Sequence, residues 1–212
     1  MHSQIEEFGF ARVPGINSIP RLVRLAKTLG NTASSTNNNV VERIFPRPQL
    51  EARPNSFGSV HGTGAYPLHS DTAHWPIPTR FLVLRVVGDV RRNTTICDAL
   101  AVYDSFDAEQ RALVRDSVWY SNFGDACFTC SMLFRHCGKQ VFRFDPQCMR
   151  PANEPAQQVT EWISEALASR REKLTWENDC AIVVDNWRMV HGRGDQPTNE
   201  LTRELQRIYV KL

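Results

Sequence analysis

Short β-rich segments bounded by turn residues are the feature that most constrains the fold of this chain. The clearest is the near-continuous apolar run from Phe81 to Val87, and residues 181–184 form a second such run. Runs of this kind, rich in β-branched residues, predict strands. Further strands are predicted over residues 8–14, 40–45, 94–97 and 205–210, and a hairpin over residues 132–144 that turns at Gly138-Lys139.

Helical patterns are confined to a few segments. Ser18 can cap a helix with Pro20 in its first turn, and two more helices are predicted over residues 107–117 and 154–170. The polar stretch 31–39 predicts a loop, and the Gly- and Ser-rich stretch 55–64 predicts a flexible connection near an open site. Many short strands with few helices predict a mainly β (α+β) protein, built as an antiparallel sandwich or barrel.

Size and composition predict one globular domain over residues 1–212. The chain has 42% apolar and 23% charged residues, as ordinary globular proteins do, and it contains no repeat or linker. A net charge of +2 gives no reason to expect a nucleic-acid partner. No apolar stretch approaches the roughly 20 residues that cross a bilayer. We therefore expect a cytoplasmic protein with no membrane contact, whose six cysteines are reduced.

The most informative motif is His69-Ser70-Asp71. Residues i and i+2 of an extended chain point to the same side, so His69 and Asp71 can present an imidazole and a carboxylate to one point. His191, which follows strand 181–184 and a polar turn, is the best third ligand, and we expect it at a strand end. Two histidines and one carboxylate form the known ligand set of non-haem iron(II) oxygenases, which leaves positions open for a 2-oxo acid and dioxygen.

Arginines follow the last of these histidines. Arg203 and Arg207 alternate with Leu205 and Tyr209, which predicts one strand face that carries both arginines. A planar guanidinium can hold a carboxylate through two parallel hydrogen bonds, as the distal carboxylate of 2-oxoglutarate requires. The alternative is a solvated basic strand that binds nothing. His-x-Asp alone is a weak motif, so the interpretation depends on the whole combination.

Taken together, these residues resemble the taurine dioxygenase and clavaminate synthase-like branch of the Fe(II)/2-oxoglutarate-dependent dioxygenases. The similarity covers about residues 60–210. It is carried by His69-Ser70-Asp71-Thr72, by residues 76–84, by residues 185–193 and by Arg203 with Arg207.

The resemblance implies a double-stranded β-helix (a jelly roll, cupin-like) core with flanking helices. It also implies Fe(II), with 2-oxoglutarate and O2 as cosubstrates. The expected reaction is hydroxylation of an unactivated C–H bond in a small polar or anionic molecule, such as an amino acid or natural-product intermediate, with release of succinate and CO2. The same core also supports desaturation, cyclisation or epimerisation.

The resemblance further assigns individual residues. His69, Asp71 and His191 correspond to the iron ligands, and Arg203 to the residue that holds 2-oxoglutarate. Thr95, or alternatively Thr94, corresponds to a threonine that contacts the same carboxylate. Arg207 corresponds to an arginine that faces an acidic substrate group, and His74 and Trp75 lie on the segment that approaches the substrate. Ala65 replaces a substrate-binding asparagine, which argues against taurine, and the carboxylate of Asp71 argues against halogenation.

Other interpretations remain open at this level. Cys127, Cys130, His136 and Cys137 could form a zinc site, although free thiols suit their spacing better. A non-catalytic, cupin-like metal-binding protein would keep the fold without the chemistry. A zinc hydrolase would need a general base beside the metal, and none is evident. Arg80 and Arg85, which bracket the strand 81–87, are interpreted as surface charges.

Overall fold

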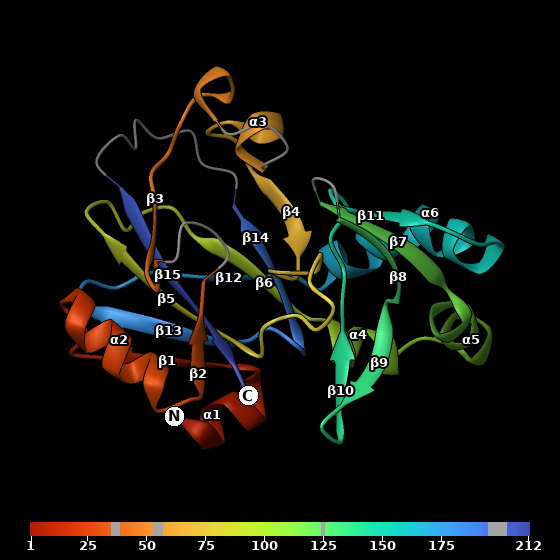
Figure 1. The fold of residues 1–212 in the computed structure, drawn as a ribbon, viewed down its shortest axis with the longest axis horizontal. Coiled ribbons are helices and arrows are strands. Elements are labelled where there is room, and N and C mark those ends of the chain that lie inside the picture. The colour runs from red at the N-terminus through yellow and green to blue at the C-terminus, as the bar shows by residue number, and fades with distance from the viewer. Residues whose placement is uncertain (35–38, 53–56, 124–125, 195–202) are drawn as a thin grey trace.

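The structure is a computed structural model that describes residues 1–34, 39–52, 57–123, 126–194 and 203–212. Two antiparallel sheets form its centre (Figure 1). The larger sheet has the order β1-β13-β5-β15-β2, with β3 also paired to β15: β1 (Phe10–Pro14), β13 (Cys180–Asp185), β5 (Phe81–Val87), β15 (Glu204–Lys211), β2 (Asn31–Ala33) and β3 (Glu42–Ile44). The smaller sheet has the order β12-β6-β14-β4: β12 (Glu172–Leu174), β6 (Thr94–Asp98), β14 (Met189–Arg193) and β4 (Tyr66–His69).

The two sheets enclose one apolar core. Leu82 and Leu84 of β5 contribute to it from the larger sheet, and Ile96 of β6 and Met189 of β14 from the smaller one. The alternate residues of β5 point the other way and are also buried, because helices cover that side. A strand covered on both faces needs apolar residues throughout, which explains the uninterrupted run that marks β5 in the sequence.

Two helices cover the outer face of the larger sheet. They are α1 (His2–Phe8), which the sequence did not predict, and α2 (Ile19–Lys27). Ser18 occupies the N-cap position of α2 and Pro20 lies in its first turn, as expected. Ile5 of α1 and Leu22 of α2 pack with Val83 and Ile208 of the sheet, so both helices belong to one outer apolar cluster.

A second lobe packs against the smaller sheet, to the right in Figure 1. Its own apolar cluster includes Leu68 of β4 and Val190 of β14, so it reaches the strands that carry the metal motif. Asp107 and Asn153 cap two of its helices through their side chains. The lobe contains α4 (Ala99–Asp104), α5 (Ala108–Asp116), α6 (Glu154–Ser169), β7 (Val118–Phe123), β8 (Ala126–Ser131), β9 (Leu133–His136), β10 (Lys139–Phe142) and β11 (Met149–Pro151).

Most predicted elements are present, with small shifts at their ends. The hairpin turns at Cys137-Gly138 and not at Gly138-Lys139, because Lys139 already pairs with His136. Cys137 and Gly138 both have positive φ (47° and 75°), as a two-residue type I′ turn requires. In the stretch 31–39, residues 31–33 form β2, and 35–38 lie outside the described residues. The stretch 55–64 contains the short helix α3 (Phe57–His61), preceded by a 3-10 turn at Gln49–Glu51; residues 55 and 56 are not described.

Arg80 and Arg85 are not surface charges. Both are 8% exposed, and each has a buried polar partner. Arg80 donates to Asp185 Oδ2 at 2.9 Å, and Arg85 donates to Gln206 Oε1 at 2.9 Å. The prediction failed because these partners come from strands far away in the sequence.

None of the described helices is both long enough and apolar enough to cross a membrane.

Candidate metal centre

His69, Asp71 and His191 meet at one buried point. His191 on β14 lies opposite His69 on β4 in the strand register, and their ring centroids are 4.7 Å apart. His69 Nε2 lies 3.7 Å from Asp71 Oδ1, and His191 Nε2 lies 3.5 Å from Asp71 Oδ2. Among the described residues this is the one group of three His, Cys, Asp or Glu side chains that could hold a metal, with its ligand atoms within 4.8 Å of one another.

The local backbone differs from the one expected. His69 ends β4, and Asp71 already lies in the following turn, where Thr72 has a positive φ of 57°. His191 sits in the middle of β14 and not at a strand end. The histidines are therefore aligned by cross-strand pairing, and the carboxylate is brought in by the turn.

Asn186 holds this turn in place. Its side chain accepts a hydrogen bond from the Asp71 amide and donates to the Asp71 and Thr79 carbonyls, all at 2.9 Å. Asn186 is fully buried in the turn between β13 and β14. Thr72 Oγ1 also donates to the Asp71 carbonyl at 2.6 Å, and it accepts from the amide of Thr79 at 2.8 Å. The position of the Asp71 carboxylate is thus fixed from both sides of the turn.

The charge states of Asp71 and His191 and the ring orientation of His69 suit a metal centre. His69 Nδ1 lies 2.9 Å from the Pro67 carbonyl, which can only accept, so Nδ1 carries the proton and Nε2 faces the cluster. Burial lowers the pKa of His191, which favours the neutral imidazole that binds metals. Burial would raise the pKa of Asp71, but the Arg207 charge and hydrogen bonds from both histidines hold it well below its usual value.

Arg207 reaches the cluster but not in the expected way. Its Nη1 donates to both Asp71 oxygens, at 2.9 and 2.8 Å. Its Nε and Nη2 donate to Glu42 Oε2, at 3.1 and 2.7 Å. Two carboxylates of the chain already pair with this guanidinium, so its contacts do not support the expectation that Arg207 binds an acidic substrate group. Glu42 was not anticipated, since nothing in the sequence of β3 marks it.

Thr95 lies on the wrong side of the smaller sheet for the metal. His191 pairs with Ile96, whose side chain belongs to the core between the sheets, whereas Thr95 lines a hollow on the outer face. Thr94 has the same orientation as Ile96, and its Oγ1 accepts from the buried Trp176 Nε1 at 3.2 Å. Thr95 therefore points away from the metal cluster, against the expectation that it contacts the cosubstrate, whereas the alternative, Thr94, points to the side of the sheet that carries His191. A change of one residue along a strand changes the face.

Three other predicted site residues lie near β15 or the cluster. Arg203 is 7% exposed and directly precedes β15, so it lies on the same side of the chain as Arg207. His74 is partly buried; burial lowers its pKa, while the nearby charges of Asp145 and Asp71 oppose this. The Trp75 ring is tilted against that of Tyr209, with ring centroids 6.0 Å apart, and Lys211 Nζ lies 4.5 Å from the centre of the Trp75 ring.

Asp145 is a site residue that the sequence analysis missed. It is 7% exposed and follows Phe144, whose carbonyl accepts from the amide of Ser70, the residue between His69 and Asp71. The Asp145 charge also contributes, after that of Asp71, to raising the pKa of His69 against the effect of burial. Its only signal in the sequence is its place directly after the predicted hairpin.

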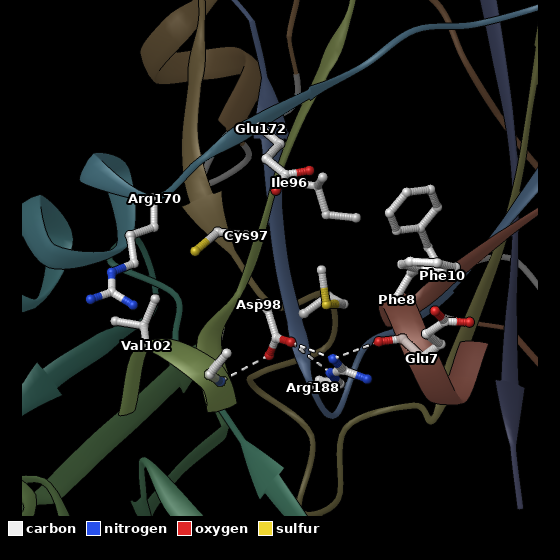
Figure 2. Close-up of a pocket in the computed structure, with 12 residues that line it drawn as sticks. Glu7, Phe8, Phe10, Ile96, Cys97, Asp98, Val102, Arg170, Glu172 and Arg188 are labelled. Carbon is white, nitrogen blue, oxygen red and sulfur yellow. Dashed lines mark hydrogen bonds and ion pairs between the residues drawn. The ribbon is translucent and has the colours of Figure 1, made fainter. Parts of the chain in front are cut away.

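The proposed zinc site is not supported. Cys127 and Cys137 are exposed and Cys130 is partly buried, and no group of metal ligands in the described chain includes them. Arg188, directly before β14, lies outside the metal cluster: it pairs with Asp98 at 2.8 Å and donates to carbonyls of α1. This pair borders a hollow of about 360 Å³ between α1 and α4, which contains no residue of the metal cluster (Figure 2).

The fold and the ligand set together define a class, that of jelly-roll proteins with a two-histidine, one-carboxylate metal centre. The sequence also matches a family described as taurine catabolism dioxygenase TauD, TfdA family, over residues 1–209. The chain belongs to this family. No curated protein matches it significantly in sequence.

Several solved structures are similar over nearly the whole chain. An asparagine oxygenase in complex with Fe(II), 2S,3S-3-hydroxyasparagine and succinate has a TM-score of 0.79 and 16% identity, covering 99% of this chain and 77% of that one. The non-haem iron oxygenase OrfP in complex with Fe and alpha-ketoglutaric acid has a TM-score of 0.74 and 17% identity, covering 99% and 77%. PvcB from Pseudomonas aeruginosa has a TM-score of 0.73 and 17% identity, covering 99% and 78%.

The similar structures confirm the double-stranded β-helix fold. The family match confirms the enzyme class, a 2-oxoglutarate-dependent non-haem iron dioxygenase. The residues present fit the metal. Two imidazoles with Nε2 toward the cluster and one carboxylate suit iron(II) and leave the remaining coordination positions open.

Proposed function

We propose that the protein hydroxylates an unactivated C–H bond of a small amino acid or a related molecule with an amino group. His69, Asp71 and His191 hold iron(II), and the buried cluster of these three side chains is the observation that carries the proposal. When bound, iron and 2-oxoglutarate supply the oxidising chemistry: one oxygen atom of O2 enters succinate, the other enters the C–H bond, and CO2 leaves.

Arg203 and Thr94 bind the distal carboxylate of 2-oxoglutarate. Arg203 is buried, and at roughly 3.3 Å per residue it lies about 13 Å along the chain from Arg207, which contacts the metal ligand Asp71. Thr94 presents its hydroxyl from the facing sheet, two residues from Ile96, the register partner of His191. A guanidinium and a hydroxyl from opposite sheets suit a carboxylate held inside the barrel.

The charges around the metal favour a cationic substrate group. Arg207 is neutralised by Asp71 and Glu42. Asp145 is buried beside His69 and His74 and accepts a hydrogen bond from the Gln147 amide at 2.8 Å, but within the described chain no lysine or arginine forms an ion pair with it. A buried carboxylate without a cation is costly, so an ammonium group brought by the substrate would be favoured there. Amino acids in similar structures, 3-hydroxyasparagine and (3S)-hydroxy-L-Arg, agree with this class.

The first test is an anaerobic titration of the iron(II)-loaded protein with 2-oxoglutarate, monitoring the weak visible charge-transfer band of a chelated keto acid. We expect the band in the wild type and its loss in His69→Ala. If iron binds and no band forms, the protein is a metal-binding jelly roll without this chemistry.

The second test addresses the substrate. Amino acids are screened by substrate-dependent succinate release, and the best one is compared in the wild type and Asp145→Asn. We expect a KM for the amino acid that is roughly tenfold to a hundredfold higher in the variant, as for loss of one charge-assisted hydrogen bond, with the charge-transfer band intact. An unchanged KM would remove Asp145 from substrate recognition.

A further inference from the structure

A second hollow lies on the outer face of the smaller sheet, away from the metal cluster. Its volume is about 230 Å³. The strand register builds its floor, because Lys173 of β12 lies opposite Thr95 of β6, and Thr95 lies opposite Gly192 of β14. Arg171, Arg193 and Asn93 complete the polar part of its wall.

The charge of this hollow has one sign. Three cations, Arg171, Lys173 and Arg193, line it together with a hydroxyl and an amide, and none of its described lining residues carries a carboxylate. The side chains of Arg171 and Lys173 form no hydrogen bond or ion pair with another described residue. A concave surface lined by charges of one sign focuses the field and attracts counter-ions.

Strand alternation produces this segregation of charge. Arg171 and Lys173 point to one side of the β12 segment, whereas Glu172 between them points to the other side and lines the hollow of Figure 2. The acidic residue of the segment is thereby kept away from the cations. Arg170 lies with Glu172 in that other hollow (Figure 2), so four consecutive charged residues are divided between two sites.

Arg193 is held in a fixed orientation. Its Nε donates to the Gly64 carbonyl and its Nη2 to the Gly62 carbonyl, both at 2.6 Å, and its guanidinium lies 3.7 Å from the centre of the Tyr66 ring. A Cβ atom at Gly192 would lie 2.9 Å from Thr95 Oγ1, so the glycine leaves that hydroxyl uncovered. A preorganised cation and an open hydroxyl lower the cost of ordering the site when a ligand binds.

We propose that this hollow binds a small, multiply charged oxyanion, with the phosphate group as the best fit. Three cations match the charge of a phosphate group, and its oxygens can accept from guanidinium, ammonium and hydroxyl donors together. A volume of about 230 Å³ is below that of sites for drug-sized ligands and has room for a phosphate group. His191 and Thr94 face the opposite side of the sheet, so this ligand is not the molecule that is oxidised.

The test is calorimetric titration with inorganic phosphate, against chloride at matched ionic strength. Saturating 2-oxoglutarate is present so that the arginine of the proposed cosubstrate site is occupied. Wild-type protein is compared with Arg171→Gln/Lys173→Gln and with the control Arg170→Gln. All three side chains are exposed, and the control removes a charge one residue away, in the other hollow.

We expect phosphate binding in the wild type, at least about tenfold weaker binding in the double variant, and less than about twofold change in the control. Absence of phosphate binding in the wild type would overturn the proposal. Full binding by the double variant would do the same, since the phosphate would then sit elsewhere. If Arg170→Gln weakened phosphate binding as much as the double variant, phosphate would be attracted by the overall positive charge, and the hollow would not be a specific site. The assay needs no turnover, so its result is independent of the proposed reaction.

Discussion

Replacing Asn186 by alanine tests whether the side-chain amide of Asn186 holds the turn that carries Asp71. The substitution removes three buried hydrogen bonds of 2.9 Å. The Asp71 carbonyl keeps the hydroxyl of Thr72, but the Asp71 amide and the Thr79 carbonyl lose this partner. At about 1–3 kcal/mol for each buried group left unsatisfied, we expect a loss of about 2–6 kcal/mol in the free energy of unfolding.

The same change should loosen the metal site. Asn186 does not contact the metal ligand atoms, but it positions the backbone of Asp71. Losing a partner that orients a metal ligand typically weakens metal binding by about 10–100-fold, and we expect a change of this size for iron(II). Urea unfolding of the metal-free protein gives the stability, and anaerobic iron(II) titration at a temperature where the variant is folded gives the affinity.

Asn153→Ala is the matched control. This side chain also forms three hydrogen bonds, with the amides of Val118 and Ala156 and the carbonyl of Asp116, but at the start of α6, where water can replace it. We expect a loss of about 1 kcal/mol, as for a helix N-cap, and unchanged iron affinity. The reasoning is refuted if Asn186→Ala binds iron as tightly as the wild type, or if Asn153→Ala weakens iron binding equally.

Three further predictions follow from the same structure. Asp71→Ala should abolish hydroxylation, measured as substrate-dependent succinate release, and full retained activity would refute its assignment as a ligand. Arg203→Ala should raise the KM for 2-oxoglutarate by about 10–100-fold through loss of a charge-assisted contact, and an unchanged KM would place that contact elsewhere. At pH 8 a disulfide reagent should label the exposed Cys127 and Cys137 rapidly; burial raises the pKa of Cys97 to about 11, so rapid labelling of Cys97 in the folded protein would contradict the structure.

Patterns along the chain were sufficient for several elements of the fold. The β5 run, the N-terminal proline of α2 and the periodicity of α6 each reflect a local requirement: burial on two faces, a fixed φ in the first turn, or one apolar helical face. By contrast, α1 was missed, and its buried Ile5 packs in a cluster with distant strands of the larger sheet. Its position depends on contacts that no local pattern encodes.

The sequence by itself determined the candidate metal ligands, because His69, Asp71 and His191 are chemically distinctive and their order along the chain is informative. It did not determine which side each neighbour faces. Thr94 and Thr95 are adjacent residues of the same type, so the sequence cannot distinguish them. Only the register of β6 against β14 directs Thr94 inward and Thr95 outward. Arg207 likewise resembled a free cation until β3 placed Glu42 beside it, and Asp145 acquired its position because the preceding Phe144 accepts a hydrogen bond from Ser70. Residue identity sets which chemistry is available, whereas strand register and long-range pairing decide which charges meet, since these depend on the whole chain.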